Sequence, residues 1–131
     1  FKKINPFYVL NFTIKNNIYG TLAAKLLSIK VINNVSGLGT SFIKRNHTTL
    51  IVSFLYKFSQ KFTKNVFCQN QANTDFIILN KLVPKDILSL TPGSGVNIDF
   101  FKPGLRVRHS DLFHPFIFLY VGRIITEKGV F

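Results

Sequence analysis

Short apolar runs alternate with longer amphipathic stretches along most of this sequence. Runs rich in β-branched and aromatic residues predict four strands, at Tyr8–Phe12, Lys30–Val35, Asn65–Gln69 and Ile87–Thr91. Apolar positions three or four residues apart predict three intervening helices, over Ile18–Ser28, His47–Phe62 and Thr74–Asn80. Strands that alternate with helices are typical of parallel α/β units. The pattern therefore predicts an α/β fold built on an incomplete parallel sheet.

The composition changes after Pro103. Residues 104–115 mix charge, histidine and glycine without periodicity, which predicts a linker. Phe116–Val121 is a continuous apolar run, typical of a strand that is buried on both faces. The sequence thus predicts a first α/β domain over residues 1–92, a hinge and linker over 93–115, and the first strand and following loop of a second domain over 116–131.

The charge of the chain is strongly one-sided, with 17 Lys and Arg against 5 Asp and Glu and a net charge of +12. Nucleic acid, an anionic membrane surface and an A/T-rich coding sequence would each account for this excess. The basic residues alternate with apolar ones instead of forming a dense tract. The part of the positive charge that serves a function is therefore assigned mainly to binding a membrane surface. No helix-turn-helix, RNP strand or zinc-ligand spacing indicates nucleic-acid binding.

Cysteine and histidine usage predicts neither a disulfide nor a metal site. Cys68 is the single cysteine, and His47, His109 and His114 lie far apart with no carboxylate spacing around them. A reducing compartment fits this usage, and no apolar run approaches the ~20 residues of a membrane span. The chain has no methionine and begins Phe-Lys-Lys, so we expect its true start to be removed or to lie outside the sequence.

Two short stretches carry the strongest candidate chemistry. Gly93, Ser94 and Gly95 form a turn after the fourth predicted strand. Either their backbone amides bind phosphate as an anion-binding nest, or the turn acts only as a hinge. Arg123 and Lys128 follow the Phe116–Val121 run, in a predicted loop between a strand and a helix. That position commonly binds phosphate in open α/β sheets, although a basic pair there is otherwise solvated surface.

Four blocks of this sequence resemble, in the same order, retaining glycosyltransferases of family 4. Thr13–Gly20 is similar to the Thr-Ile-Lys-Pro-Asn-Ile-Tyr-Gly signature of bacterial transferases that build surface polysaccharide on a lipid carrier. Val35–Gly39 is similar to a Val-Thr-Gly-Leu-Gly loop, and Phe67–Asn70 with Asp75 and Phe76 resembles a Phe-Gln-Asn…Asp…Phe segment. The last block comprises Pro92–Val96, Phe101–Pro103 and Gly122–Gly129.

Several positions depart from the family pattern. Asn16 stands where the family has proline, and Asn97 stands where an aspartate commonly follows Gly-Val. Asn73 and Thr74 occupy a place where an acidic residue is more usual. The paired-glutamate motif of the donor domain has no counterpart in the sequence. Ordinary drift or relaxed selection on a decaying gene would each explain the substituted positions, whereas the paired glutamates are expected in a part of the donor domain that the sequence does not include.

The resemblance implies two Rossmann-like domains that face each other across a cleft. Residues 1–92 would be the C-terminal part of the acceptor-side domain, and residues 116–131 would begin the donor-binding domain. The implied enzyme moves a hexose or N-acetylhexosamine from a nucleotide sugar to a polyprenyl diphosphate acceptor, without metal or other cofactor. This stretch alone is expected to be inactive, either because a complementing chain carries the missing parts or because it is a split-gene remnant.

The resemblance also assigns roles to single residues. Arg123 and Lys128 would grip the donor diphosphate, helped by the amides of the turn at residues 93–95. On the acceptor side, Lys15 would bind a phosphate, while Gly37 and Gly39 would shape a loop. The alternatives without a binding role are that Lys15 is an ordinary surface lysine and that Gly37 and Gly39 serve only to form the turn.

A basic and apolar region over Phe42–Lys64 predicts peripheral docking on the cytoplasmic face of the plasma membrane. The docking residues would be Lys44, Arg45, Lys57 and Lys61. The simpler alternative is a helix that packs into the core and solvates its basic face. Beside the enzyme, a non-catalytic basic α/β module that associates with anionic membrane stays open.

Overall fold

The computed structural model describes residues 1–39, 42, 47–102, 118–122, 124 and 129. The chain divides into two units, Phe1–Gly95 and Val96–Phe131. Elements of the first unit follow the order β1 (Tyr8–Phe12), α1 (Ile14–Leu26), β2 (Lys30–Val35), α3 (His47–Gln60), β3 (Asn65–Cys68), α4 (Gln71–Leu79), a 3-10 turn η1 (Lys85–Ile87) and β4 (Leu88–Leu90).

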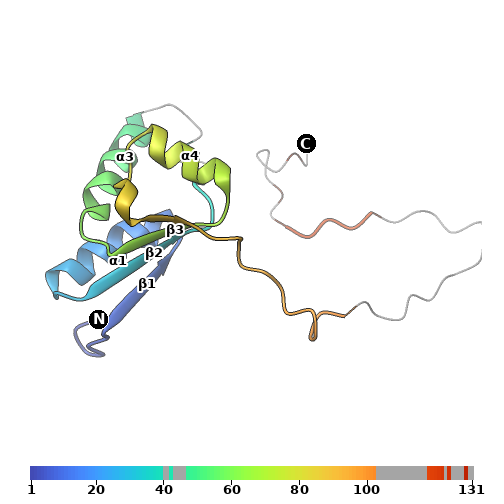
Figure 1. Cartoon of the computed structure of the whole chain (residues 1–131), viewed down its shortest axis with the longest axis horizontal. Helices are drawn as coiled ribbons and strands as arrows, with labels where there is room; N and C mark the ends of the chain where they lie inside the picture. Colours follow the sequence, from blue (N-terminus) through green and yellow to red (C-terminus); the bar gives the residue numbers. More distant parts are fainter. Residues whose placement is uncertain (40–41, 43–46, 103–117, 123, 125–128, 130–131) are drawn as a thin grey trace, which may run out of the picture. The chain divides into compact units, whose positions relative to one another are not determined.

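The four strands form one parallel sheet in the order β1-β2-β3-β4 (Figure 1). The register pairs Asn11 with Asn33 across β1 and β2, Asn33 with Val66 across β2 and β3, and Val66 with Leu88 across β3 and β4. A helix connects each strand to the next, as parallel pairing requires. The predicted α/β fold with a Rossmann-like parallel sheet is confirmed.

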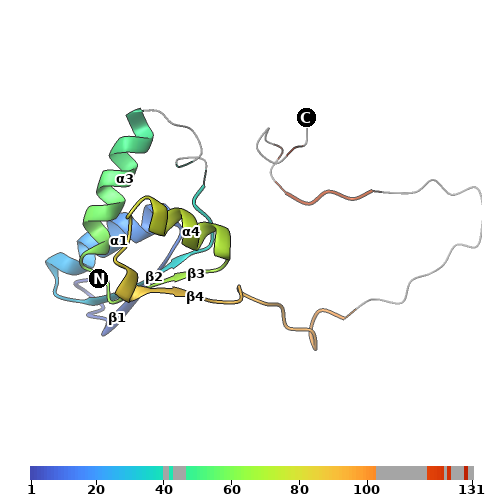
Figure 2. The same ribbon diagram turned by 45° about the horizontal axis from the view of Figure 1, so that its top comes forward.

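All three helices cover the same face of this sheet (Figures 1 and 2). Every crossover leads to the neighbouring strand in one direction, and parallel crossovers are right-handed, so each helix lands on the same side. Burial follows this arrangement. On β2, Val31, Asn33 and Val35 face the helices and are fully buried, whereas Lys30, on the other face, is exposed. The sheet therefore has a covered face and an open face.

The core lies between the covered face and the helices. Its main cluster joins β2 and β3 to α3 and α4, and its buried members are Ile18, Val35, Phe42, Tyr56, Val66, Cys68, Ile77, Leu82 and Val83. A smaller cluster of Val9, Ala24, Ile29 and Val31 lies under the C-terminal half of α1. Edge-to-face ring contacts join Phe42 to Tyr56 and to Phe76, each at 6.0 Å between centroids.

Two helices begin earlier than predicted, because polar residues start them. The α1 helix begins at Ile14, not Ile18, and its first turn contains Asn17, which is fully buried. The α4 helix begins at Gln71, not Thr74, because the Asn70 side chain caps it by accepting the backbone N–H of Asn73 at 2.8 Å. The apolar stripes used for the prediction start only after these polar turns.

The second unit contains the predicted strand Phe116–Val121. Its described part, Phe118–Val121, is exposed and forms no strand with any described residue. The division after Gly95 falls inside the predicted hinge of residues 93–115. The boundaries at 92 and 115 and the strand that opens a second domain stay predictions.

Candidate functional site

Most of the predicted site residues described here lie at the carboxyl edge of the sheet, where ligands bind in open α/β folds. The ends of β1 to β4 lead there into Thr13–Lys15, Ser36–Gly39, Gln69–Asn70 and Thr91–Gly95. Arg123, Lys128, Lys44 and Arg45 lie outside the described residues. The structure therefore describes the acceptor-side candidates and the glycine turn, but not Arg123 and Lys128, which are predicted to bind the donor diphosphate.

Gln69 joins three segments at this edge. Its side-chain Nε2 donates to Asn34 Oδ1 at 3.1 Å and to Ser94 Oγ at 2.9 Å. Its backbone N–H donates to Val35 O at 3.4 Å. The end of β3 is thereby tied to the end of β2 and to the glycine turn, 25 residues further along the chain. Both N–H groups of the Gln69 amide are used in this bridge.

The glycine turn is held at its start as well. The backbone N–H and the hydroxyl of Thr91 both donate to Cys68 O, at 2.8 and 3.1 Å. Gly93 and Gly95 have φ angles of 95° and 66°, a left-handed backbone that residues with a Cβ rarely adopt. A Cβ on Gly93 would meet only Gln69 O, at 4.0 Å. Backbone conformation, rather than crowding, therefore requires glycine at these two positions.

The turn from β1 into α1 is strained. Thr13 has φ 72° and ψ 151°, a region that is almost restricted to glycine and costs about 1–3 kcal/mol for other residues. Two hydrogen bonds from Asn17 hold this turn, one from its backbone N–H to Thr13 O at 2.9 Å and one from its side-chain Nδ2 to Asn34 O at 3.1 Å. Lys15 lies exposed in this strained first turn.

The two acceptor-side glycines differ. Gly39 has φ 67°, so its backbone favours glycine, whereas Gly37 has no left-handed φ and open space where a Cβ would stand. Both are exposed in the loop after β2. A structural role in the turn thus accounts for Gly39, and nothing in the local geometry requires glycine at position 37.

Sequence reasoning missed a polar network buried under α1, directly below the candidate site. Asn33 Nδ2 donates to Gln60 Oε1 at 2.7 Å and to Thr21 Oγ1 at 3.0 Å, and Asn11 Nδ2 donates to Asn33 Oδ1 at 2.9 Å. All four side chains are buried. The backbone of α1 approaches this network closely, since a Cβ on Gly20 would collide with the Asn11 amide. These residues anchor α1 and α3 to the sheet below Lys15.

Two ionisable groups lie in the core beside the network. Burial raises the pKa of the Tyr56 hydroxyl, and the neighbouring Asn17 side chain offsets only part of that rise. Neither the Tyr56 hydroxyl nor Asn17 Oδ1 makes a hydrogen bond to any described residue. Burial also raises the pKa of the Cys68 thiol, partly offset by a hydrogen bond with Thr74. Both groups are therefore neutral at pH 7, and neither is poised as a nucleophile.

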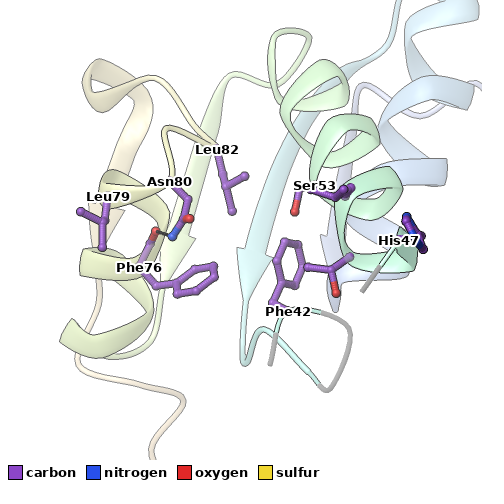
Figure 3. Close-up of a pocket in the computed structure, with 9 residues that line it drawn as sticks. Phe42, His47, Ser53, Phe76, Leu79, Asn80 and Leu82 are labelled. Carbon is purple, nitrogen blue, oxygen red and sulfur yellow. Dashed lines mark hydrogen bonds between the residues drawn. The ribbon is translucent and has the colours of Figure 1, made fainter. Parts of the chain in front are cut away.

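A groove of about 790 Å³ lies between α3 and α4 (Figure 3). The close-up shows the rings of Phe76 and Phe42 next to each other, with Leu82 above them in the view. Asn80 on the α4 side donates its side-chain N–H to Phe76 O at 2.8 Å. The remaining lining comes from α3 and the end of α4: His47, Thr49, Leu50, Ser53 and Leu79.

The α3 helix exposes four apolar residues and buries two polar ones beside Tyr56, while Val52 and Leu55 pack partly buried against the core. Leu50 and Phe54 are about 70% exposed, at 69% and 70%, and Ile51 and Phe58 are exposed with them. Tyr56, Ser59 and Gln60 are fully buried on the opposite side. The predicted apolar positions Leu50, Phe54 and Phe58 are therefore exposed, and α3 packs into the core through Tyr56, Val52 and Leu55 instead.

The predicted docking residues Lys57 and Lys61 lie exposed on and just after α3. No helix in the described part of the chain is long and apolar enough to cross a membrane. Among the same residues, no three His, Cys, Asp or Glu side chains are grouped closely enough to hold a metal ion.

No protein-family model matches this chain, and no curated protein matches it either. The resemblance to family-4 glycosyltransferases therefore rests on the quoted motifs.

Proposed function

We propose that this chain is part of a retaining glycosyltransferase of family 4. The enzyme would move a hexose or N-acetylhexosamine from a nucleotide sugar to a polyprenyl diphosphate-linked acceptor in surface polysaccharide synthesis. One observation carries this proposal: the left-handed Gly93–Gly95 turn is tied to the carboxyl edge of a parallel sheet by Gln69 and Thr91. That edge is where α/β proteins bind phosphorylated ligands.

The proposed chemistry follows from the charge that develops during transfer. When the glycosidic bond breaks, the nucleoside diphosphate leaves with increased negative charge, and preorganised cations and amides stabilise that charge. Arg123 and Lys128 would supply the cations, and the amides of Gly93, Ser94 and Gly95 would supply the dipoles. Lys15, exposed in the strained turn after β1, would bind the acceptor phosphate.

A titration with nucleotide sugars tests this proposal. Residues 1–131 are labelled with ¹⁵N and titrated with UDP-glucose, UDP-N-acetylglucosamine and GDP-mannose, with UMP as the ligand that lacks a diphosphate. We expect the amide signals of Gly93 and Gly95 to shift with at least one nucleotide sugar and not with UMP. The double variant Arg123→Ala, Lys128→Ala should lose the shift, and the sugar nucleotide should not be turned over.

Lys64→Ala is the matched control, because Lys64 is an exposed lysine before β3, at the amino edge of the sheet. It should keep the shifts of the unsubstituted chain. Shifts confined to residues away from the glycine turn, or shifts that survive the double variant, would contradict the assignment of the donor site. Sugar-nucleotide turnover by the isolated chain would contradict its expected inactivity.

The outward apolar face of α3 favours a second candidate, a non-catalytic basic module that binds anionic membrane. Leu50, Phe54 and Phe58 would enter the interface while Lys57 and Lys61 contact lipid headgroups. Flotation with vesicles of phosphatidylglycerol and phosphatidylcholine tests it. Binding should require the anionic lipid, weaken with salt and be lost in Phe54→Glu, while Leu26→Glu, at a position on α1 that is exposed to 85%, should keep it. Binding to both vesicle types alike would contradict this docking mode.

A further inference from the structure

The bridge made by Gln69 fixes the orientation of two polar side chains at the carboxyl edge of the sheet. Gln69 Nε2 donates one hydrogen bond to Asn34 Oδ1 at 3.1 Å and one to Ser94 Oγ at 2.9 Å. A side-chain amide nitrogen has two N–H groups and accepts no hydrogen bond, so each partner must present an oxygen to it. Gln69 therefore sets the direction of both hydrogen bonds.

This direction leaves hydrogen-bond donors on the far side of both partners. Because Asn34 turns its Oδ1 towards Gln69, its Nδ2 group points the other way and reaches no acceptor among the described residues. Ser94 Oγ accepts from Gln69, so its own proton is left to donate, and no described residue receives it. Asn34 is half-buried and Ser94 is exposed, so both groups reach solvent.

Asn34 is also held through its backbone. Its carbonyl oxygen accepts from Asn17 Nδ2 at 3.1 Å, and its strand position lies between Phe12 on β1 and Phe67 on β3. Strand pairing and this bond fix the backbone of Asn34, while Gln69 fixes its amide. A donor that is already held in place loses little conformational entropy when it binds a ligand.

The glycine turn adds backbone donors beside the Ser94 hydroxyl. Ser94 lies between Gly93 and Gly95, whose left-handed φ angles are 95° and 66°. Successive amides around a left-handed residue form a concavity that binds anions. Side-chain N–H, hydroxyl and backbone N–H groups together select a ligand group that only accepts hydrogen bonds, as the oxygens of a phosphate do.

We propose that Asn34 and Ser94 bind a diphosphate group, and that Gln69 is the positioning residue that turns both side chains into donors. No motif of the sequence assigns a ligand to Asn34 or this role to Gln69. The inference deepens the proposed function and rests on it for the origin of the diphosphate, which belongs either to the nucleotide of the donor or to the lipid carrier of the acceptor.

A titration that follows side-chain amides tests the inference. Residues 1–131, labelled with ¹⁵N, are titrated with inorganic pyrophosphate, then with UDP for the donor and with farnesyl diphosphate for the acceptor. We expect pyrophosphate to move the Asn34 Nδ2 signals, identified by their loss in Asn34→Asp, together with the amide signals of Gly93 and Gly95. A tighter response to UDP assigns the diphosphate to the donor, and a tighter response to farnesyl diphosphate assigns it to the acceptor.

Two nearly isosteric variants separate positioning from a purely structural tie. Asn34→Asp still accepts from Gln69 but has no outward N–H group. Gln69→Glu only accepts, so Asn34 and Ser94 would turn their donors inwards to it. Each variant should weaken pyrophosphate binding about tenfold or more, because a hydrogen bond to a charged group is lost. Ser94→Thr keeps the hydroxyl and should keep the binding, whereas Ser94→Ala should weaken it.

Gln71→Glu is the matched control, because it adds the same charge two residues further along. Gln71 is exposed, and its Nε2 donates to Asp75 Oδ1 at 2.7 Å and not to the glycine turn. This variant should bind pyrophosphate like the original chain. Circular dichroism verifies that every variant keeps its fold.

Three results would overturn the inference: Asn34 signals that do not move, shifts confined to lysine-bearing segments away from the glycine turn, and binding by Gln69→Glu as tight as that of Gln71→Glu. Failure of the proposed function gives a different result. Pyrophosphate binding that depends on Asn34 and Gln69, without binding of UDP or farnesyl diphosphate, would support the anion site and contradict the transferase.

Discussion

At the central positions of β1 and β2, the covered and the open faces of the sheet reverse the usual distribution of polar and apolar side chains, although Val9, Val31, Val35 and Val66 keep the rest of the covered face apolar. Below the helices, the central positions of β1 and β2 are asparagines, Asn11 and Asn33, and both are buried. On the open face, the same strands present Leu10 and Ile32, and Leu10 is mostly exposed. Burial in this unit is therefore set by which side the helices cover, and hydropathy alone does not reveal that side.

The α3 helix repeats this reversal. It buries Ser59 and Gln60 against the sheet and exposes Leu50 and Phe54. The buried polar groups are tolerated because they hydrogen-bond to one another: Gln60 accepts from Asn33, and its Nε2 donates to Ser59 Oγ at 2.9 Å. The exposed apolar groups have no such compensation in water. Such surfaces on a small unit commonly mark contacts with a membrane or a partner.

The largest effect should come from breaking the polar network at its centre. Asn33→Ala removes the group that contacts Asn11, Thr21 and Gln60, so Gln60 Oε1 loses its donor and Asn11 and Thr21 keep only their long bond to each other at 3.5 Å. We expect a loss of about 3 kcal/mol in the free energy of unfolding, from the cost of unsatisfied buried groups. Urea unfolding followed by circular dichroism measures it. Asn16→Ala, at an exposed position in α1, is the control and should change stability little. Equal effects of the two substitutions would contradict a structural role for the network.

A smaller, pH-dependent effect should come from Tyr56. Its ordinary pKa is 10.0, and burial raises the pKa in the folded state. The folded protein therefore holds the phenol proton above pH 10, where the unfolded chain releases it. The stability from this group is complete below pH 10 and is lost as the pH rises from 10 towards the folded pKa. The expected slope is about 1.4 kcal/mol per pH unit for one proton.

Tyr56→Phe isolates this contribution. Because the hydroxyl has no hydrogen-bond partner among the described residues, the substitution should change stability by less than about 1 kcal/mol at pH 7. Above pH 10 the variant should lose stability with a shallower slope than the original chain. The raised pKa of Cys68 causes a further loss of stability at high pH, and the Tyr56→Phe variant shares that loss with the original chain. Thermal unfolding between pH 7 and 11 measures both. Parallel pH profiles of the two proteins would show that Tyr56 does not titrate as proposed.

Much of the fold could be predicted from the sequence, because strands such as Lys30–Val35 are β-branched and lie between helical patterns. The covered side could not be predicted. Asn33 and Gln60 appear as polar interruptions in the sequence, and their contact joins positions 27 residues apart. The glycine turn was predictable from Gly93 and Gly95, since few other residues adopt their backbone. Its tie to Gln69 was not, because a hydrogen bond across 25 residues leaves no local pattern.

The smallest effect should come from the open face and is the most direct test of the reversal. Leu10→Thr places a polar, β-branched residue on β1 where the side chain already contacts water. We expect a change within about 0.5 kcal/mol in the free energy of unfolding, as for other exposed positions. Val31→Thr on the covered face places the same hydroxyl in a fully buried site and should cost about 2 kcal/mol, because that group would lack a partner. Urea unfolding of both variants decides the comparison. A cost at Leu10 as large as that at Val31 would mean that Leu10 is already shielded from water in the isolated chain.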